Sequence, residues 1–148
     1  MARHFLIIDA RFYTDIADEL VAGASAELQG RGATFERISV PGVLEIPAAL
    51  SMVLESERGG SFDGFVLLGC VIRGETSHYD IVANESARAV MDLAVDLGLA
   101  VGNGILTVEN GDQAWARARV SEKNKGASAA AAAFKMAALR ESLGVSDV

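Results

Sequence analysis

The feature that most restricts the fold is an apolar run at residues 64–71, GFVLLGCV, which contains no charged side chain. Apolar residues at every position, rather than at alternate ones, are typical of a strand that is covered on both faces. Such strands belong to parallel sheets with helices on either side. The run therefore predicts the central strand of an α/β domain.

Three other short runs and five helical patterns surround this strand. We expect the remaining strands at residues 4–9, 35–40 and 100–108, and the helices at residues 15–31, 46–57, 81–96, 111–118 and 125–143. Strand and helix alternate three times before a last strand and two helices, an order that predicts parallel strands with right-handed crossovers. The expected architecture is a three-layer αβα sandwich with a four-stranded parallel sheet, which is flavodoxin-like, in a single domain over residues 1–148.

Some helix faces can also be predicted from the pattern. The apolar face of the first helix is made by residues four apart: Ile16, Leu20, Ala24 and Leu28. The buried stripe expected in the long third helix is Val82, Ala89, Leu93 and Leu97. The last helix contains a run of alanines broken by one serine, residues 127–133, which predicts close packing against another element of the same chain.

Composition argues against several classes of function. The net charge of −7, without a basic stripe, argues against a general nucleic-acid or anionic-membrane partner. Cys70 is the only cysteine, which excludes an intrachain disulfide and a thiolate metal cluster, and His4 and His78 alone do not make a zinc site. Residues 5–8 are too short for the core of a signal peptide, and no apolar run reaches the length of a membrane span. We therefore expect a cytoplasmic enzyme or binding domain.

In a parallel sheet of this kind, ligands bind at the carboxyl ends of the strands. The candidate loops are residues 10–14, 41–47, 69–80 and 107–113. The third of them, GCVIRGETSHYD, joins the central strand to a helix through a glycine-containing turn, so its backbone N–H groups can face an anion. Its histidine, His78, can move protons near neutral pH. This loop predicts an anion site beside a proton-transfer group.

The same loops carry motifs that resemble those of one enzyme family. They contain Arg11-Phe12, PGVLEIP at residues 41–47, GCVIRGETSHYD at residues 69–80 and LTVEN at residues 106–110, followed by Gln113-Ala114 and Asn124-Lys125-Gly126. From about residue 5 to residue 140 the chain resembles lumazine synthase, an enzyme of riboflavin biosynthesis. That family condenses 5-amino-6-(D-ribitylamino)pyrimidine-2,4-dione with 3,4-dihydroxy-2-butanone 4-phosphate to give 6,7-dimethyl-8-ribityllumazine, phosphate and water. The resemblance implies the lumazine synthase fold, no metal, no organic cofactor, and sites shared by adjacent subunits of a pentamer.

The resemblance also implies roles for the residues around the phosphate. His78 is the expected general acid and base, with a purely structural hydrogen bond as the alternative. The phosphate is expected to be held by backbone N–H groups and one hydroxyl, from Gly74, Glu75 and Thr76, although this loop can also be a simple capped turn. Arg117 is expected to bind the phosphate from the adjacent subunit. Alternatively, Arg117 lies on a solvated face of its helix. Arg119 is a competing candidate for the phosphate.

For the pyrimidine and its ribityl chain, the resemblance implies that Phe12 stacks on the ring. Tyr13 competes for that role, and a place in the core is the alternative for Phe12. Glu45 is the expected acceptor for ribityl hydroxyls, although a carboxylate there also suits a helix N-terminus. The other substrate-binding candidates are Val43, Leu44, Val71, Ile72, Asn103 and Lys125.

Asn103 departs from the family pattern, because many members carry an aromatic residue at this position. An aromatic residue is also common at the position of Leu44. Without the second ring, the substrate loses a stacking partner, so we expect weaker substrate binding with the chemistry intact.

Three other functions stay open on sequence grounds. A binding protein would keep the pocket and hold lumazine or a flavin, although such a protein needs neither His78 nor Arg117. A structural subunit would join a shell of roughly 60 subunits, but only three residues precede the first strand, and we expect an isolated pentamer. A flavodoxin or receiver domain shares the sheet class but needs a hydroxyl-rich first loop or an acidic cluster, and the sequence shows neither.

Overall fold

The computed structural model describes residues 2–145 and contains one sheet of four parallel strands. The strands are β1 (His4–Ala10), β2 (Thr34–Val40), β3 (Gly64–Ile72) and β4 (Val101–Val108). They lie in the order β2–β1–β3–β4, so β2 and β4 are the edges of the sheet. β3 is an inner strand and is buried over nearly its whole length, as its apolar run predicts.

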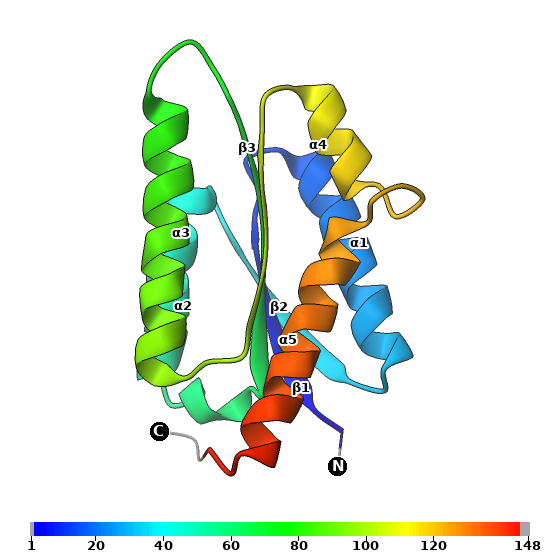
Figure 1. Cartoon of the computed structure of the whole chain (residues 1–148), viewed down its shortest axis with the longest axis vertical. Helices are drawn as coiled ribbons and strands as arrows, with labels where there is room; N and C mark the ends of the chain where they lie inside the picture. The colour runs from blue at the N-terminus through cyan, green and yellow to red at the C-terminus, as the bar shows by residue number, and fades with distance from the viewer. Residues whose placement is uncertain (1, 146–148) are drawn as a thin grey trace.

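Helices cover both faces of this sheet, with α2 and α3 on one side and α1, α4 and α5 on the other (Figure 1). The helices are α1 (Thr14–Gly30), α2 (Ile46–Glu55), α3 (His78–Leu97), α4 (Gly111–Ala118) and α5 (Lys125–Ser142), with short 3₁₀ turns η1 (Val43–Glu45) and η2 (Gly59–Ser61). Each face has its own apolar core, because successive side chains of a strand point to opposite faces. Phe5 and Ile7 pack with α1 and α5, whereas Leu6 and Ile8 pack with α2. The predicted three-layer α/β sandwich with a parallel sheet is confirmed.

The predicted boundaries agree with the structure to within two residues, except at the start of α3. This helix begins at His78 and not at residue 81. The earlier turn forms because the Ser77 carbonyl accepts the N–H groups of Asp80 and Ile81, at 3.1 and 3.3 Å. Asp80 in this first turn also suits the positive end of the helix dipole. His78 is therefore the first residue of a helix and not part of a loop.

The buried faces of two helices show where periodicity succeeds and where it fails. The predicted stripe of α1 is confirmed, since all four of its members are buried: Ile16, Leu20, Ala24 and Leu28. The predicted stripe of α3 is only partly confirmed: Val82 is buried and Leu93 packs half buried against the core on the α2 side, whereas Leu97 is 36% exposed. The buried residues of α3 are Val82, Ser86 and Val90. Because α3 carries apolar residues on more than one side, its pattern does not identify the face that meets the sheet.

The alanine run of α5 packs within the chain, as predicted. α5 lies so close to β4 that a Cβ on Gly102 would be 1.8 Å from the carbonyl oxygen of Ala129. It also lies so close to α1 that a Cβ on Gly126 would be 2.1 Å from the carbonyl oxygen of Leu20. A glycine inside a strand usually weakens it. Gly102 is nevertheless required, because α5 packs so closely against β4.

Two further findings bear on membranes and metals. Among residues 2–145, no helix is long and apolar enough to cross a bilayer. The same part of the chain contains no group of three or more His, Cys, Asp or Glu side chains placed to hold a metal ion.

Candidate active site

A cavity of about 450 Å³ lies where the loops after β1, β2 and β3 meet at the carboxyl end of the sheet, and we call it the first cavity. It brings together candidates that are far apart in the chain: Phe12, Val43, Leu44, Glu45, Val71, Ile72, Gly74, Thr76 and His78. Glu75 is exposed and is not among the lining residues. Another hollow, of about 390 Å³, is lined by residues at the opposite end of the sheet, including Phe62 and Leu99, and contains none of the candidates.

The floor of the first cavity is apolar and closely packed. A Cβ on Gly69 would lie 2.8 Å from Cγ2 of Val43 and 3.2 Å from Cβ of Ala10, so only glycine lets these loops meet. Burial raises the pKa of the Cys70 thiol to about 12. The thiol is therefore neutral at physiological pH and is not a nucleophile, in agreement with a packing role.

His78 places its side chain on the wall of this cavity from the first position of α3. Its backbone N–H donates to the hydroxyl of Thr76 at 3.3 Å. Within residues 2–145 the imidazole itself has no hydrogen-bond partner. Both ring nitrogens are thus available to a ligand, and the alternative of a structural imidazole hydrogen bond receives no support.

The loop that precedes α3 can hold an anion. Gly74 and Thr76 line the cavity, and the amino end of α3 behind them carries partial positive charge. The cap residue Ser77 makes no side-chain cap. Because the N–H groups of His78, Asp80 and Ile81 already donate within the described part of the chain, the donors left for a ligand are those of Tyr79 and of the preceding loop. The Thr76 hydroxyl accepts from a backbone N–H and can still donate its own proton to a phosphate oxygen.

Arg73 closes this loop, a role that the sequence analysis did not assign. Its guanidinium lies 4.2 Å from the centroid of the Tyr79 ring and 3.5 Å from the carboxylate of Asp80. Its Nε also donates to Glu109, beyond β4, at 2.9 Å. The arginine thus joins the two ends of the loop to each other and to the neighbouring strand connection.

Phe12 and Glu45 enter the same cavity from the two other loops. The Phe12 ring is 74% exposed, whereas Tyr13 is half buried against the core, so the core role falls to Tyr13. Glu45 ends η1 just before α2, and its Oε1 lies 3.2 Å from where a Cβ on Gly42 would be. Glu45 therefore lines the first cavity and also precedes a helix, a position that fits both interpretations of this residue.

The other candidates line a separate cavity of about 360 Å³, which we call the second cavity. It lies along the edge strand β4, beside α4 and α5, and contains Asn103, Arg117 and Lys125. No residue lines both cavities. Since β4 has no strand on its outer side, a neighbouring molecule can approach this cavity directly.

The second cavity is positively charged. Arg117 is half buried on α4 and donates through Nη1 to the carbonyl of Gln113 at 3.1 Å. Among the described residues, neither Arg117 nor Lys125 pairs with a carboxylate. Arg119, in contrast, is paired with Glu122 at 3.1 Å. The arginine left for an external anion is therefore Arg117.

Asn103 lies on the exposed side of β4 in this cavity. Its Oδ1 accepts the backbone N–H of Ile105 at 2.9 Å. The side chain thus satisfies a backbone donor of an edge strand and keeps its own amide N–H groups for a ligand.

A chain of contacts connects the two cavities through the connection between β4 and α4. Glu109 pairs with Arg73, and its backbone N–H donates to Oε1 of Gln113 at 2.8 Å. Gln113 in turn accepts from Arg117 through its carbonyl, and its N–H donates to the side chain of Asn110, the N-cap of α4, at 2.9 Å. The loop that precedes His78 and the helix that carries Arg117 are therefore held in a fixed relation within one chain.

Known proteins are similar to this chain in sequence. A sequence model of the family described as 6,7-dimethyl-8-ribityllumazine synthase matches residues 2–141. The chain belongs to the lumazine synthase family. It is 60% identical over 143 residues to 6,7-dimethyl-8-ribityllumazine synthase 1 of Rhizobium meliloti (strain 1021), a match that covers 95% of this chain and 94% of the relative. It is 59% identical to 6,7-dimethyl-8-ribityllumazine synthase of Agrobacterium fabrum, with 95% and 97% covered, and 57% identical to that of Bartonella bacilliformis, with 95% and 92% covered.

In this lumazine synthase family member, the chemical groups are divided between the two cavities. The first cavity has apolar walls, an aromatic ring, a carboxylate and an imidazole, but no lysine or arginine lines it. The second has Arg117 and Lys125 but no histidine. A phosphorylated substrate that must also exchange protons therefore needs both sets of groups.

Proposed function

We propose that the protein is a 6,7-dimethyl-8-ribityllumazine synthase, which condenses 5-amino-6-(D-ribitylamino)pyrimidine-2,4-dione with 3,4-dihydroxy-2-butanone 4-phosphate. The observation that carries the proposal is the convergence of Phe12, Glu45 and His78, from three separate segments that follow β1, β2 and β3, on one cavity. In a member of the lumazine synthase family, these are the groups that such a reaction requires for stacking, for hydroxyl binding and for proton transfer.

The first cavity receives the pyrimidine substrate. Phe12 stacks on the heterocycle, and Glu45 accepts hydrogen bonds from the ribityl hydroxyls. The buried side chains of Val43 and Val71 keep water from the far wall. Holding two reactants in the geometry of attack can lower the barrier by roughly 7–11 kcal/mol, so binding supplies a large part of catalysis.

The chemistry requires several proton transfers, for which we propose His78. The 5-amino nitrogen attacks the ketone carbon, and the imidazole takes the proton that this nitrogen loses. It then protonates the hydroxyl that leaves as water when the imine forms. Loss of the proton at C3, next to the imine, then expels phosphate from C4, and the enol that results becomes a ketone at C3. The ribitylamino nitrogen attacks this ketone and closes the ring with loss of a second water. The same imidazole can serve each step, because it both gives and takes protons near pH 7.

We propose that the second cavity of an adjacent subunit completes the site and binds the phosphate through Arg117, opposite Gly74, Glu75 and Thr76. Lys125 and Asn103 then face the first cavity of the neighbour. The open edge of β4 supports this arrangement, and so do the exposed apolar side chains of α3: Ile81, Met91 and Val95. We propose an isolated pentamer of single-domain chains, residues 1–148, and light scattering would distinguish it from a larger shell.

We also propose that the reaction takes place in the cytoplasm. Both substrates are strongly polar, and one is charged, so neither crosses a bilayer unaided. An enzyme that consumes them is expected in the compartment in which they are made.

The direct test is to mix the purified protein with both substrates and to follow the fluorescence of the lumazine product. We expect product only when both substrates are present, at a rate proportional to protein concentration. A protein that binds the product tightly but forms none of it would instead support the binding-protein alternative and contradict the proposal.

A further inference from the structure

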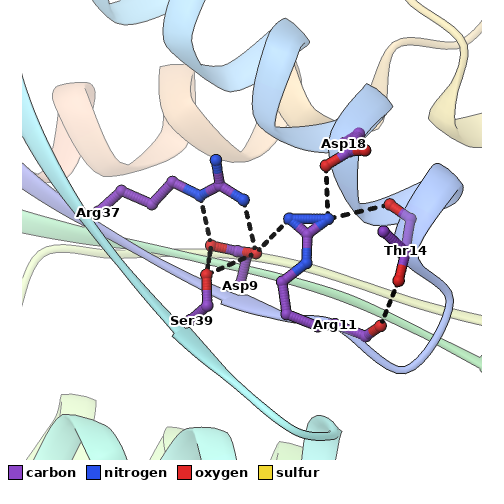
Figure 2. A network of polar contacts seen from close by, with 6 residues as sticks. All are labelled: Asp9, Arg11, Thr14, Asp18, Arg37 and Ser39. Carbon is purple, nitrogen blue, oxygen red and sulfur yellow. Dashed lines mark hydrogen bonds and ion pairs between the residues drawn. The ribbon is translucent and has the colours of Figure 1, made fainter.

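A buried carboxylate lies near the end of β1, before the loop that carries Phe12, and outside the groups discussed so far. Asp9, near the end of β1, is fully buried (Figure 2). Arg37 of β2 donates to it through Nε and Nη2, at 2.8 and 3.1 Å, and the Ser39 hydroxyl donates at 3.1 Å. The guanidinium of Arg11 lies on its other side at 3.1 Å. A buried carboxylate stays charged only when such partners surround it. The same contacts hold the guanidinium groups of Arg37 and Arg11 in place.

Arg11 fixes the loop that follows β1 at both of its ends (Figure 2). Its backbone N–H donates to the carbonyl of Val40 at 2.9 Å, which extends the ladder between β1 and β2. Its Nη2 donates to the carbonyl of Thr14 at 3.0 Å and also binds the carboxylate of Asp18 on α1. The Thr14 hydroxyl donates back to the carbonyl of Arg11 at 3.1 Å. Only two residues, Phe12 and Tyr13, lie between these tied ends.

Phe12 has little packing of its own that could fix its position. Its ring is 74% exposed and meets Tyr13 edge-on at 4.9 Å between centroids. The direction of the ring therefore depends on the backbone of a short loop. That backbone is held by Arg11, and Arg11 is held by Asp9.

We propose that Arg11, locked by Asp9, is a positioning residue that sets the Phe12 ring where the pyrimidine substrate stacks. It acts through Phe12 and does not itself line the first cavity. The inference rests on the proposed function, since it assigns the ring of Phe12 to the pyrimidine. Arg37 shares the same carboxylate but lies on β2, away from the loop, and so offers a matched control.

The test compares Arg11→Gln with Arg37→Gln. Each variant removes one guanidinium from Asp9, and both are expected to lower the melting temperature. Only Arg11→Gln is expected to raise the KM for the pyrimidine, by about tenfold, which is the loss of one well-placed stacking contact. The KM for the butanone phosphate and kcat should stay nearly unchanged, because the phosphate groups and His78 are untouched. Asp18→Asn, which removes only the outer partner of Arg11, should give a smaller rise in the same KM.

Calorimetric titration with the pyrimidine alone separates this inference from the proposed function. Weaker binding in Arg11→Gln and unchanged binding in Arg37→Gln would support the positioning role, even if the wild-type protein formed no product. Equal pyrimidine affinity in Arg11→Gln and the wild type would overturn it, as would an equal loss in both arginine variants. If Arg11→Gln does not fold, Asp18→Asn decides the question, and an unchanged pyrimidine affinity there would also overturn the inference. The absence of any pyrimidine binding to the wild type would contradict both proposals.

Discussion

The two cavities of this chain are built in different ways. The first is enclosed by three loops over a floor of buried aliphatic side chains, and it carries an aromatic ring and an imidazole. The second lies along an edge strand, against the small residues of α5, and carries two cations. One is suited to a flat heterocycle and to proton transfer, the other to an anion. The cationic side chains and the imidazole therefore lie in separate cavities of one copy of the chain.

The largest effect is expected for the proton-transfer group of the first cavity. His78→Ala should lower kcat by about 10²–10⁴-fold, because no other imidazole lies among the lining residues. Binding of the lumazine product, measured by fluorescence titration, should be nearly unchanged, since the stacking ring and the carboxylate remain. Wild-type turnover in this variant would remove His78 from the mechanism.

Substitutions in the second cavity should change the affinity for substrate. Arg117→Gln is expected to raise the KM for the butanone phosphate by roughly 10- to 100-fold, the value of a charge-assisted hydrogen bond, and to leave pyrimidine binding unchanged. Arg119→Gln is the control, because Arg119 is exposed and paired with Glu122. Steady-state kinetics with each substrate varied in turn would measure both. Equal effects of the two substitutions would contradict the assignment of Arg117 to the phosphate.

A substitution at Asn103 can give the second cavity an aromatic ring, which the first cavity already has. Asn103→Phe should strengthen pyrimidine binding by about three- to tenfold, because it supplies the second ring that many family members carry. It also removes the acceptor for the Ile105 N–H, so a small loss of stability is expected. Isothermal titration with the pyrimidine would test the first effect and urea unfolding the second. Unchanged or weaker binding would show that the ring is not needed at this edge.

We expect the buried thiol of Cys70 to have the smallest effect on activity. Its titration and reactivity test whether the floor of the first cavity is closed. Burial raises the pKa of Cys70 from 9.0 to about 12, so the folded chain keeps the proton that the unfolded chain loses first. Stability from this source is constant below about pH 9 and should fall as the pH rises from about 9 towards 12. Urea unfolding at several pH values should show this fall in the wild type and a weaker one in Cys70→Ala. Rapid alkylation of the native thiol at pH 8 would contradict the description of a closed floor.

Sequence predicts the fold and most of the first cavity because both depend on local patterns. The apolar run of β3 indicates an inner strand, and parallel strands place their following loops at one edge of the sheet. Residues such as Phe12, Glu45 and His78 could therefore be assigned to one region before the structure was known. The start of α3 was misplaced because its first turn is stabilised by backbone groups of Ser77, which no side-chain pattern reveals.

Other features could not be predicted because they depend on contacts between distant segments. Arg73 pairs with Glu109 and Arg37 pairs with Asp9, and these residues become neighbours only through the order of strands and the strand register. A sequence shows that such charges exist but not which of them pair. The buried face of α3 was only partly predicted for a related reason, since apolar residues lie on more than one side of this helix and only its contacts with other elements decide which side is buried.

The division of the site between two copies is tested most directly by mixing two variants, with the butanone phosphate kept well below its wild-type KM so that each variant alone is nearly inactive. His78→Ala and Arg117→Gln are each purified, unfolded, and refolded together in equal amounts. If the first cavity of one chain works with the second cavity of its neighbour, random mixing in a ring restores about a quarter of the sites to wild-type composition. Product formation should therefore return to about a quarter of the wild-type rate. If both residues act within one chain, every site in the mixture carries a defect, and activity would stay at the level of the separate variants.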